Sequence, residues 1–391
     1  MEIYRPPACL LTPKKLSPDM AKSENLFLGM MSGTSLDGID TVLIRCLTAG
    51  GIPELIATNF QPIDDQTKND LLNLCNAPEV KIQTLGQLDT RMGHIFANAA
   101  LNLLQLTKTK PQEISAIGCH GQTIYHAPND SYPFTMQIGD PNLISELTGI
   151  TTIADFRRRD IAAGGQGAPI APLFHRLIFK DDKQSRVILN LGGIANITLL
   201  DPNRPEAAFD TGPANILMDY WVSKHKNKPY DHSGEWASSE SVNKSLLKIF
   251  REENYFNLPQ PKSTGRELFN ASWLESKLAD AALDLSPSAV QATLLELTAS
   301  TISDAIKLLE PVDEILVCGG GAHNSSLLNR LQTLLTKSKI TSTAVLGLNP
   351  DWIEATAFAW MAGETLAGRK LDTRSFTGAE RSVYLGAIYQ G

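Results

Sequence analysis

Two segments of the same design constrain this chain most, and each consists of an apolar run, a short turn and a second apolar run. The first covers residues 27–45, FLGMMSGTSLDGIDTVLIR, and the second covers residues 186–200, RVILNLGGIANITLL. Strand-like runs joined by glycines predict β-hairpins. The two segments lie about 160 residues apart, and each opens a stretch in which strand and helix patterns alternate. The repetition predicts an α/β chain made of two related halves.

The turn of the first segment has the residue types of a phosphate-binding loop. Gly33 and Gly38 permit a positive φ and close approach of the backbone, and three hydroxyl residues lie around them. Such a turn can present several N–H groups to an anion. Asp37 or Asp40 could hold a hydrated magnesium ion beside it. A single loop of this composition is more often an ordinary turn, but the second loop favours two phosphate-binding hairpins facing one nucleotide.

Length and composition limit the alternatives. The 391 residues exceed the usual size of one core, which predicts two domains. A formal net charge of -7 argues against a nucleic acid or an anionic membrane as partner. Five scattered cysteines without a CxxC pair suit a reducing compartment. Residues 1–24 contain prolines and charges but no apolar core of a secretion signal, so we expect a flexible extension on a soluble, cytoplasmic protein.

Polar motifs follow two predicted strands of the first half. The strand predicted at 113–118 leads into the stretch GCHGQT, and the carboxyl ends of strands are where open α/β sheets bind ligands. The strand predicted at 151–155 leads into three consecutive arginines between Asp155 and Asp160, followed by a glycine-rich loop at 163–169. The arginines could form a solvated ion-pair patch. They could also line a pocket for an anionic substrate, because the planar guanidinium binds carboxylate or phosphate at two points.

The second half contains a candidate base and a candidate adenosine loop. Asp210 follows the second hairpin and could act as general base, or it could cap the next helix. A buried strand at 313–318 breaks at three glycines before a helix, so that adenine and ribose could lie against bare backbone. Neither GxGxxG nor GxxxxGK[ST] occurs. Glu354, in the first turn of a helix predicted at 352–367, is either a dipole-stabilised acid or a site carboxylate.

These elements, in this order, match the layout of the actin, sugar-kinase and heat-shock-chaperone ATPase superfamily. Within it, the chain closely resembles the anhydro-N-acetylmuramic acid kinases from about residue 26 to the end. The resemblance implies an α/β fold in which two ribonuclease-H-like (actin-like ATPase) domains flank a central nucleotide cleft. This chain departs from the family's pattern at Ala214, where the family usually has glycine. The matching stretches are GMMSGTSLDGID (29–40), GCHGQT (118–123), IADFRRRDIAAGGQGAP (153–169), LNLGGIAN (189–196), FDTGPANILMD (209–219), PKSTGRE (261–267), CGGGAHN (318–324) and the region around Glu354.

The charged, loop-like stretch at 180–185 predicts the boundary between two domains, and the resemblance implies the reaction. Domain I would comprise residues 25–184 and 372–391, and domain II residues 185–371, with 1–24 as an N-terminal extension. The enzyme would open the 1,6-anhydro ring of 1,6-anhydro-N-acetylmuramic acid with water and transfer the γ-phosphoryl group of ATP to O6. The products would be N-acetylmuramic acid 6-phosphate and ADP, formed in peptidoglycan recycling. ATP and Mg²⁺ would be the cofactors.

The site residues implied by the resemblance fall into three groups. Asp210 would be the catalytic base that deprotonates the water. His120, Arg159, Asp160 and Glu354 would surround the sugar, and Asp37 would hold Mg²⁺ through water. The nucleotide would contact Gly33, Thr34, Ser35, Leu36, Asp37, Gly38, Ile39, Asp40, Gly192, Gly193, Asn196, Gly319, Gly320, Gly321 and Asn324.

Two other functions fit the nucleotide motifs alone. One is a kinase of another sugar or small acid, against which the FRRRD and GGQGAP stretches speak. The other is a chaperone-like ATPase gated by nucleotide, in which the sugar-side motifs would have no use. The family further suggests a homodimer that acts on a small-molecule amino-sugar and binds neither nucleic acid nor membrane.

Overall fold

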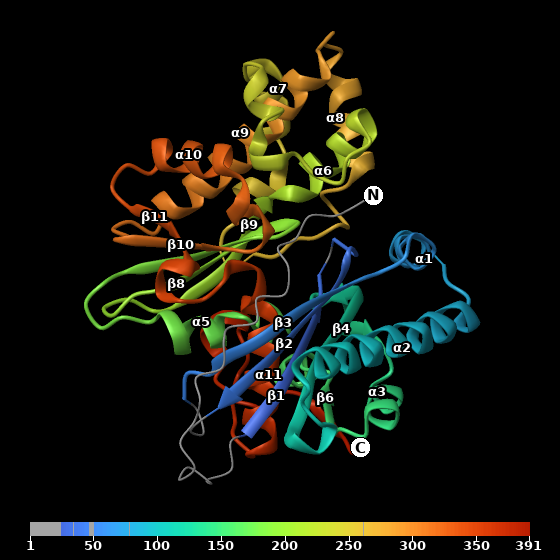
Figure 1. Ribbon diagram of the computed structural model, residues 1–391. Helices are drawn as coiled ribbons and strands as arrows, with labels where there is room; N and C mark the ends of the chain where they lie inside the picture. Colours follow the sequence, from blue (N-terminus) through green and yellow to red (C-terminus); the bar gives the residue numbers. More distant parts are fainter. Residues whose placement is uncertain (1–24, 34, 47–50, 78, 261) are drawn as a thin grey trace. The chain divides into compact units, whose positions relative to one another are not determined.

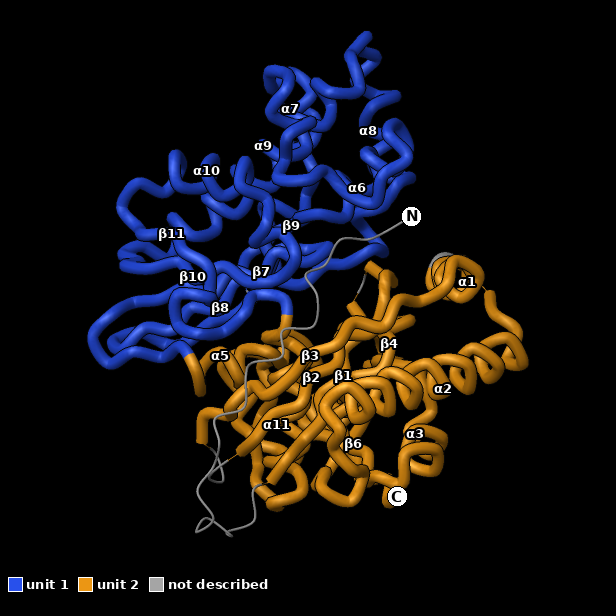
Figure 2. Tube along the Cα trace, in the orientation of Figure 1, with its two compact units in different colours: residues 1, 179–351 blue, residues 2–178, 352–391 orange. Residues whose placement is uncertain are grey.

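The computed structural model describes residues 25–33, 35–46, 51–77, 79–260 and 262–391. Thr34 and the expected extension 1–24 lie outside these residues. The chain forms two compact units, one of residues 179–351 and the other of residues 25–178 and 352–391 (Figure 2). Residues 352–371 therefore group with the first part of the chain, on the other side of the boundary expected from the sequence.

The unit of residues 25–178 and 352–391 is built on one seven-stranded sheet, with the order β12-β6-β4-β1-β2-β3 and with β5 paired to β4 (Figure 1). Its strands are β1 (Asn25–Ser32), β2 (Gly38–Cys46), β3 (Glu54–Pro62), β4 (Ile114–Ala127), β5 (Phe134–Ile138), β6 (Thr152–Ala154) and β12 (Ala387–Tyr389). Its helices are α1 (Asp65–Asn76), α2 (Ile82–Thr107), α3 (Pro141–Thr148), α4 (Arg158–Ile161), α5 (Pro172–Phe179, which ends at the unit boundary), α11 (Ile353–Leu366) and α12 (Arg374–Thr377), with η1 (Pro111–Glu113).

The unit of residues 179–351 has a five-stranded sheet with the order β11-β10-β7-β8-β9. Its strands are β7 (Arg186–Leu191), β8 (Ile194–Leu200), β9 (Ala207–Pro213), β10 (Glu314–Cys318) and β11 (Lys339–Ser342). Its helices are α6 (Asn215–Lys226), α7 (Lys244–Arg251), α8 (Ala271–Ala281), α9 (Pro287–Lys307) and α10 (Ser325–Leu334). Short 3-10 turns are η2 (His232–Gly234), η3 (Ala237–Ser239), η4 (Asn254–Asn257), η5 (Gly320–His323), η6 (Thr343–Leu346) and η7 (Pro350–Trp352).

The two sheets share one topology. In each, three successive antiparallel strands (β1–β2–β3 and β7–β8–β9) are followed by strands parallel to the first, β4 and β6 in one unit and β10 and β11 in the other. This order and these directions define the ribonuclease-H-like fold. The predicted α/β class and the two hairpins are thereby confirmed.

In the unit of residues 25–178 and 352–391, called the larger unit from here on, helices cover both faces of the sheet. Leu88, Met92 and Phe96 of α2 belong to the same buried cluster as Leu28 and Leu43 of the sheet. The backbone of β1 lies directly against the backbone of α11 at Gly29. A Cβ atom added at Gly29 would lie 1.9 Å from the carbonyl oxygen of Ala355. The central strand β1 therefore reads as an almost continuous apolar run, as expected for a strand buried on both faces.

One local prediction is wrong, and in the first hairpin turn the residue with a positive φ is not a glycine. The strand expected to end at residue 118 continues to Ala127, because the polar stretch that follows pairs with β5, and Gln122 also pairs with Ser32 of β1. In the first hairpin turn, Leu36 has the positive φ, 55°, whereas Gly33 and Gly38 do not. Leu36 is 1% exposed, so burial of its side chain in the core offsets the cost of this conformation.

Candidate active site

Asp210 lies in a row of polar residues that crosses the sheet of residues 179–351. It is the direct partner of Asn196 on β8, and Asn196 is the direct partner of Asn190 on β7. Directly paired residues project to the same face of a sheet. The register shifts beside Asn196, so that Thr211 is an extra residue on β9. Such bulges re-aim neighbouring side chains and are common near active sites.

The segment that follows η4 holds Asp210 from the other side. The N–H of Asp210 donates to the carbonyl oxygen of Lys262 at 2.9 Å, and the N–H of Thr264 donates to Oδ2 of Asp210 at 3.0 Å. Tyr255 donates its hydroxyl proton to the Asp210 carbonyl oxygen at 2.8 Å. Burial, with Asp210 as the next cause, raises the pKa of Tyr255, so this phenol stays a donor. Both the backbone and the carboxylate of Asp210 are therefore fixed.

The glycine turn of the second hairpin faces the start of α6. The carbonyl oxygens of Gly192 and Gly193 accept the N–H groups of Asn215 and Ala214 at 3.1 and 2.9 Å. Ala214 has a negative φ, -106°, and is fully buried, so the alanine at this position is accommodated without left-handed strain. The predicted nucleotide residues of this turn are thus joined to the helix that follows Asp210.

The glycine segment Gly319–Gly321 lies against β7. Gly319 has φ 78°, and a Cβ atom there would lie 2.4 Å from Oδ1 of Asn190. A side chain at this position is excluded on both counts. Gly320, by contrast, has nothing within 4 Å of its Cβ direction, so open space adjoins its backbone. Asn324 uses its Oδ1 to accept the N–H of Leu327, which makes it the N-cap of α10.

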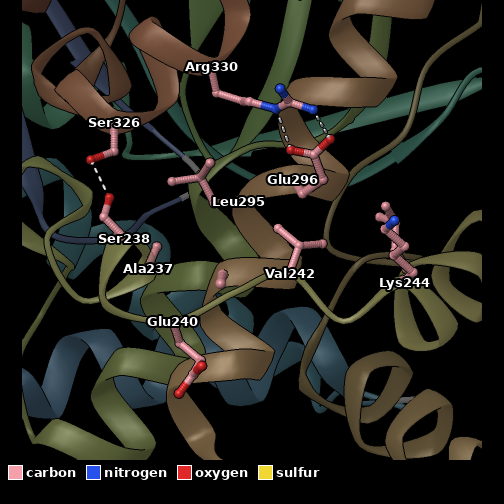
Figure 3. Close-up of a pocket in the computed structure, with 11 residues that line it drawn as sticks. Ala237, Ser238, Glu240, Val242, Lys244, Leu295, Glu296, Ser326 and Arg330 are labelled. Atoms are coloured by element: carbon pink, nitrogen blue, oxygen red, sulfur yellow. Dashed lines mark hydrogen bonds and ion pairs between the residues drawn. The ribbon is translucent and has the colours of Figure 1, made fainter.

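A pocket of about 400 Å³ lies beside α10 in the same unit (Figure 3). Ala237, Ala292 and Leu295 give it apolar walls. Arg330 of α10 makes a double ion pair with Glu296 of α9 at 2.6 and 2.7 Å along one side. Ser238 and Ser326 are joined by a 2.7 Å hydrogen bond along the other side. The sequence had not pointed to this pocket, whose lining comes from three separate segments.

In the other unit, the turn of the first hairpin is held by Ser32 and Ser35. The Ser32 hydroxyl lies 2.6 Å from Oε1 of Gln122 and 3.2 Å from the carbonyl oxygen of Gly38, which ties the turn to β4. The hydroxyl of Ser35 donates to Oδ1 of Asp37. Asp37 and Asp40 are both partly exposed. The turn thus presents a hydroxyl and a carboxylate to solvent, which is compatible with a hydrated cation.

His120 is buried and neutral. Its Nδ1–H donates to the carbonyl oxygen of Gly121 at 2.9 Å, so its Nε2 is left to accept the Nε–H of Arg157 at 3.0 Å. Burial, reinforced by the Arg157 guanidinium, holds the pKa of His120 well below its usual value. Arg157 also donates from Nη1 to the carbonyl oxygen of Gly167 at 2.9 Å. One arginine thereby joins β4 to the glycine-rich loop.

Glu354 lies near the same arginine. It occupies the first turn of α11 and is partly exposed. Burial raises the pKa of Glu354, and the Arg157 guanidinium opposes that shift. Four residues further along α11, the ring of Phe358 lies 4.7 Å from that of His120. The structure therefore brings His120, Glu354 and Arg157 into one neighbourhood.

The three consecutive arginines have different environments. Arg157 faces inward, as described above. Arg158 is exposed and lies 3.5 Å from Asp155, which is the solvated pair considered from the sequence. Arg159 is exposed as well. Asp160, in contrast, is fully buried, and its two oxygens accept the N–H of Gly167 at 2.7 Å and the hydroxyl of Thr377 at 2.9 Å.

Sequence reasoning did not single out several residues that hold the site. Arg157, Tyr255 and Thr264 are the main ones, and the signal for Thr264 was present in the distinctive stretch 261–267. Among the described residues, no group of three or more His, Cys, Asp or Glu side chains could hold a metal ion by itself. None of the described helices combines the length and apolar character needed to cross a membrane.

Comparison with known proteins identifies the family. The family described as "Anhydro-N-acetylmuramic acid kinase" matches residues 25–391. The chain is 48% identical over 372 residues to the anhydro-N-acetylmuramic acid kinase of Vibrio cholerae, covering 95% of this chain and 99% of the relative. It is 47% identical over 372 residues to the Pasteurella multocida protein of the same name, covering 95% and 98%.

Among solved structures, this chain is similar to the activator of the 2-hydroxyisocaproyl-CoA dehydratase from Clostridium difficile with bound ADPNP. The TM-score is 0.46 and the sequence identity is 14%, and the match covers 88% of this chain and 96% of that one. At nearly half identity over almost the full length of its relatives, the chain belongs to the anhydro-N-acetylmuramic acid kinase family.

Proposed function

We propose that this chain is a phosphotransferase that uses ATP and water to convert 1,6-anhydro-N-acetylmuramic acid into N-acetylmuramic acid 6-phosphate and ADP. Membership of the family is the observation that carries the proposal. The clamped carboxylate of Asp210 supports it, because a reaction that activates one water molecule needs a base held in a fixed orientation. The product would serve peptidoglycan recycling.

Asp210 is the base in this mechanism. Its carboxylate takes a proton from the attacking water, and the water oxygen bonds to the anomeric carbon C1. The bond between C1 and O6 breaks, and its electron pair stays on O6. O6 then accepts the γ-phosphoryl group as the bond to the β-phosphate oxygen breaks and ADP leaves. The Thr264 N–H donates to Oδ2 of Asp210, and in this proposal that hydrogen bond helps to orient the carboxylate toward the water.

We assign the phosphates of ATP to the two glycine turns, residues 33–40 and Gly192–Gly193 with Asn196. Adenosine is assigned to Gly319–Gly321 and to the pocket beside α10. Support for this assignment comes from the open space at Gly320 and from the apolar walls of the pocket, which suit a flat purine. Asn324 is assigned an indirect part in nucleotide binding, because it caps the N-terminus of α10 directly after the glycine segment. Phosphoryl transfer requires such positioning more than covalent chemistry from the protein.

Mg²⁺ is assigned to Asp37 through water, with Asp40 as the neighbouring carboxylate. Mg²⁺ keeps several waters and is commonly held by one or two carboxylates together with substrate phosphates, so a dedicated cluster of protein ligands is not required. The partly exposed Asp37 and the Ser35 hydroxyl that donates to it fit this mode. When bound, the ion would neutralise charge that develops on the phosphate oxygens.

Arg159 and Glu354 are assigned to the sugar. His120, whose two ring nitrogens are occupied by the Gly121 carbonyl oxygen and by Arg157, is assigned an indirect role through Arg157. The exposed guanidinium of Arg159 is available to an anionic group, and Glu354, whose pKa is raised by burial, can exchange a proton with a sugar hydroxyl. Asp160 is assigned a sugar-side role through the loop: its buried oxygens hold Gly167 and Thr377, and Gly167 in turn contacts Arg157. The homodimer and the cytoplasmic location stay predictions.

Mass spectrometry of the product formed in oxygen-18 water tests the coupled reaction. We expect one labelled oxygen at the anomeric hydroxyl and none in the phosphate group. Phosphorylated product without label would show that the ring opens without attack by water. Release of phosphate from ATP at the same rate with and without the anhydro-sugar would favour a nucleotide-gated ATPase instead.

A further inference from the structure

The side chain of Lys262 fastens the segment that holds Asp210. Its ammonium group donates to the carbonyl oxygen of Tyr255 at 2.9 Å and to that of Phe256 at 3.2 Å. The same Nζ atom lies 4.6 Å from the centroid of the Tyr255 ring, which is within the range of a cation–π contact. Lys262 is thereby joined to two successive residues of η4.

These contacts complete a closed ring of hydrogen bonds through Asp210. The Lys262 ammonium donates to the carbonyl oxygen of Tyr255 at 2.9 Å, and the Tyr255 hydroxyl donates to the carbonyl oxygen of Asp210 at 2.8 Å. The N–H of Asp210 donates to the carbonyl oxygen of Lys262 at 2.9 Å. Each of the three residues donates one hydrogen bond of the ring and accepts one. The loss of any member therefore opens the ring.

The same ammonium supports a second contact with β9. Gly212 has φ 145°, and a Cβ atom added there would lie 2.8 Å from Cε1 of the Phe256 ring. This ring also stacks on that of Phe269, with the centroids 5.6 Å apart. Because Lys262 holds the Phe256 carbonyl oxygen, its side chain is connected to both places at which the segment meets β9.

The position of the Lys262 ammonium has a cost in hydration. Burial lowers the pKa of Lys262, because partial removal from water disfavours the charged form. Two carbonyl oxygens and one face of an aromatic ring are the groups that offset this cost. An apolar side chain of similar length would pack here without any loss of hydration. A role in holding the segment at one position explains why a cation is present instead.

The amide that orients the proposed base lies close to Lys262 in the chain. Thr264 follows two residues later, and its N–H donates to Oδ2 of Asp210 at 3.0 Å. A displacement of Lys262 would therefore displace this donor. We propose that Lys262 is a positioning residue of the reaction, which holds the segment so that the Asp210 carboxylate is directed at the attacking water. The proposal rests on the proposed function, and the proton transfer stays with Asp210.

Steady-state kinetics of Lys262→Met and Lys262→Arg test the proposal. Methionine keeps an unbranched, flexible side chain without a donor, whereas arginine keeps the positive charge and can donate to two carbonyl oxygens. We expect Lys262→Met to lower kcat about ten- to hundredfold, because a small misplacement of a catalytic group has effects of this size. KM for the sugar and for ATP should stay close to wild type. Lys262→Arg should recover most of kcat, and an unchanged kcat in Lys262→Met or equal losses in both variants would overturn the proposal.

Tyr255→Phe removes a different member of the ring and allows a double-mutant cycle. Either substitution alone opens the ring, so the double variant should have about the same kcat as the slower single variant. Losses that multiply would show that the two residues act independently and would overturn the proposal. Tyr255→Phe removes one hydroxyl group only, so it also serves if Lys262→Met does not fold. A normal kcat in Tyr255→Phe would then overturn the proposal.

Lys277→Met is the matched control. The Nζ atom of Lys277 lies 5.8 Å from the centroid of the Trp273 ring and 3.8 Å from Oε2 of Glu253, so the variant removes another lysine with an aromatic contact from the same unit. Its kcat should equal that of the wild type, and a loss as large as in Lys262→Met would overturn the proposal. A wild-type enzyme that makes no phosphorylated sugar would instead overturn the proposed function. The melting temperatures of the single and double variants, non-additive where the ring exists, separate these two cases.

Discussion

The backbone N–H of Thr264 donates a hydrogen bond to Oδ2 of Asp210 at 3.0 Å, although 54 positions separate the two residues in the chain. An N–H held against one carboxylate oxygen helps to fix the plane of the carboxylate. The orientation of the proposed base is therefore set by backbone geometry, which substitutions of the Thr264 side chain would largely preserve.

Asp210→Asn should abolish turnover with little effect on the fold. The asparagine carbonyl oxygen can still accept the Thr264 N–H, but the amide cannot take a proton from water. We expect kcat to fall by about 10²–10⁴-fold, the usual contribution of a general base. ATP affinity, measured by calorimetry, and the melting temperature should stay close to wild type. A near-normal kcat would remove Asp210 from the mechanism.

Gly29→Ala should destabilise the larger unit strongly. The added Cβ atom would lie 1.9 Å from the carbonyl oxygen of Ala355, so β1 and α11 would have to separate. We expect a loss of about 1–3 kcal/mol or more in the free energy of unfolding, measured with urea. Because α11 carries Glu354, the KM for the sugar should rise as well.

Gly86→Ala is the matched control for this substitution. Gly86 lies within α2, is exposed, and has nothing within 4 Å of its Cβ direction. Alanine at such a position should stabilise the helix by about 0.5–1 kcal/mol. Equal effects of the two substitutions would show that the close contact between β1 and α11 is absent in solution.

The parts of the fold that follow from local pattern were predictable from the sequence. The paired apolar runs around Gly33 and Gly192 predicted both hairpins, and the spacing of apolar residues at 82–106 predicted α2. The extension of β4 to Ala127 was not predictable, because its polar residues are stabilised by pairing with β5 and β1, a tertiary effect. The positive φ of Leu36 likewise depends on burial of its side chain.

The site was predictable in its residue types and less so in its contacts. Sequence reasoning placed Asp210 beside the second hairpin, and its pairing with Asn196 agrees. It could not tell which of the three arginines points inward, since a run of identical residues carries no directional signal. The structure shows that Arg157 contacts His120 and Gly167, while Arg158 and Arg159 are exposed. The role of each proposed contact stays a prediction until it is measured.

Ser326→Phe should weaken the binding of ATP. Ser326 is partly exposed on α10 and lines the pocket assigned to adenosine, so a phenyl ring there would occupy part of the volume of about 400 Å³. We expect KM for ATP to rise about tenfold, with KM for the sugar unchanged. Asn329→Phe adds the same ring to an exposed position of the same helix that does not line the pocket, and it should leave both constants unchanged. Equal KM values for ATP in the two variants would exclude adenosine from this pocket.

Stability should rise as the pH is raised from about 4.5 to 6.5. Burial lowers the pKa of His175 to about 3 and, with Arg157, that of His126 to about 4, whereas the unfolded value is 6.5. Between these values the unfolded chain binds protons that the folded chain excludes, so the free energy of unfolding increases with pH. A buried group such as His175 contributes up to about 1.4 kcal/mol per pH unit over this range.

Glu354 acts in the opposite direction, which provides the internal control. Its pKa is raised by burial, so the folded chain holds this proton more tightly and its contribution to stability decreases as the pH rises above its unfolded value of 4.5. Urea unfolding at pH 4.5, 5.5 and 6.5 should therefore show a steeper rise of stability for Glu354→Gln than for the wild type. A flat or falling profile in the variant would mean that the histidines are not buried as neutral rings.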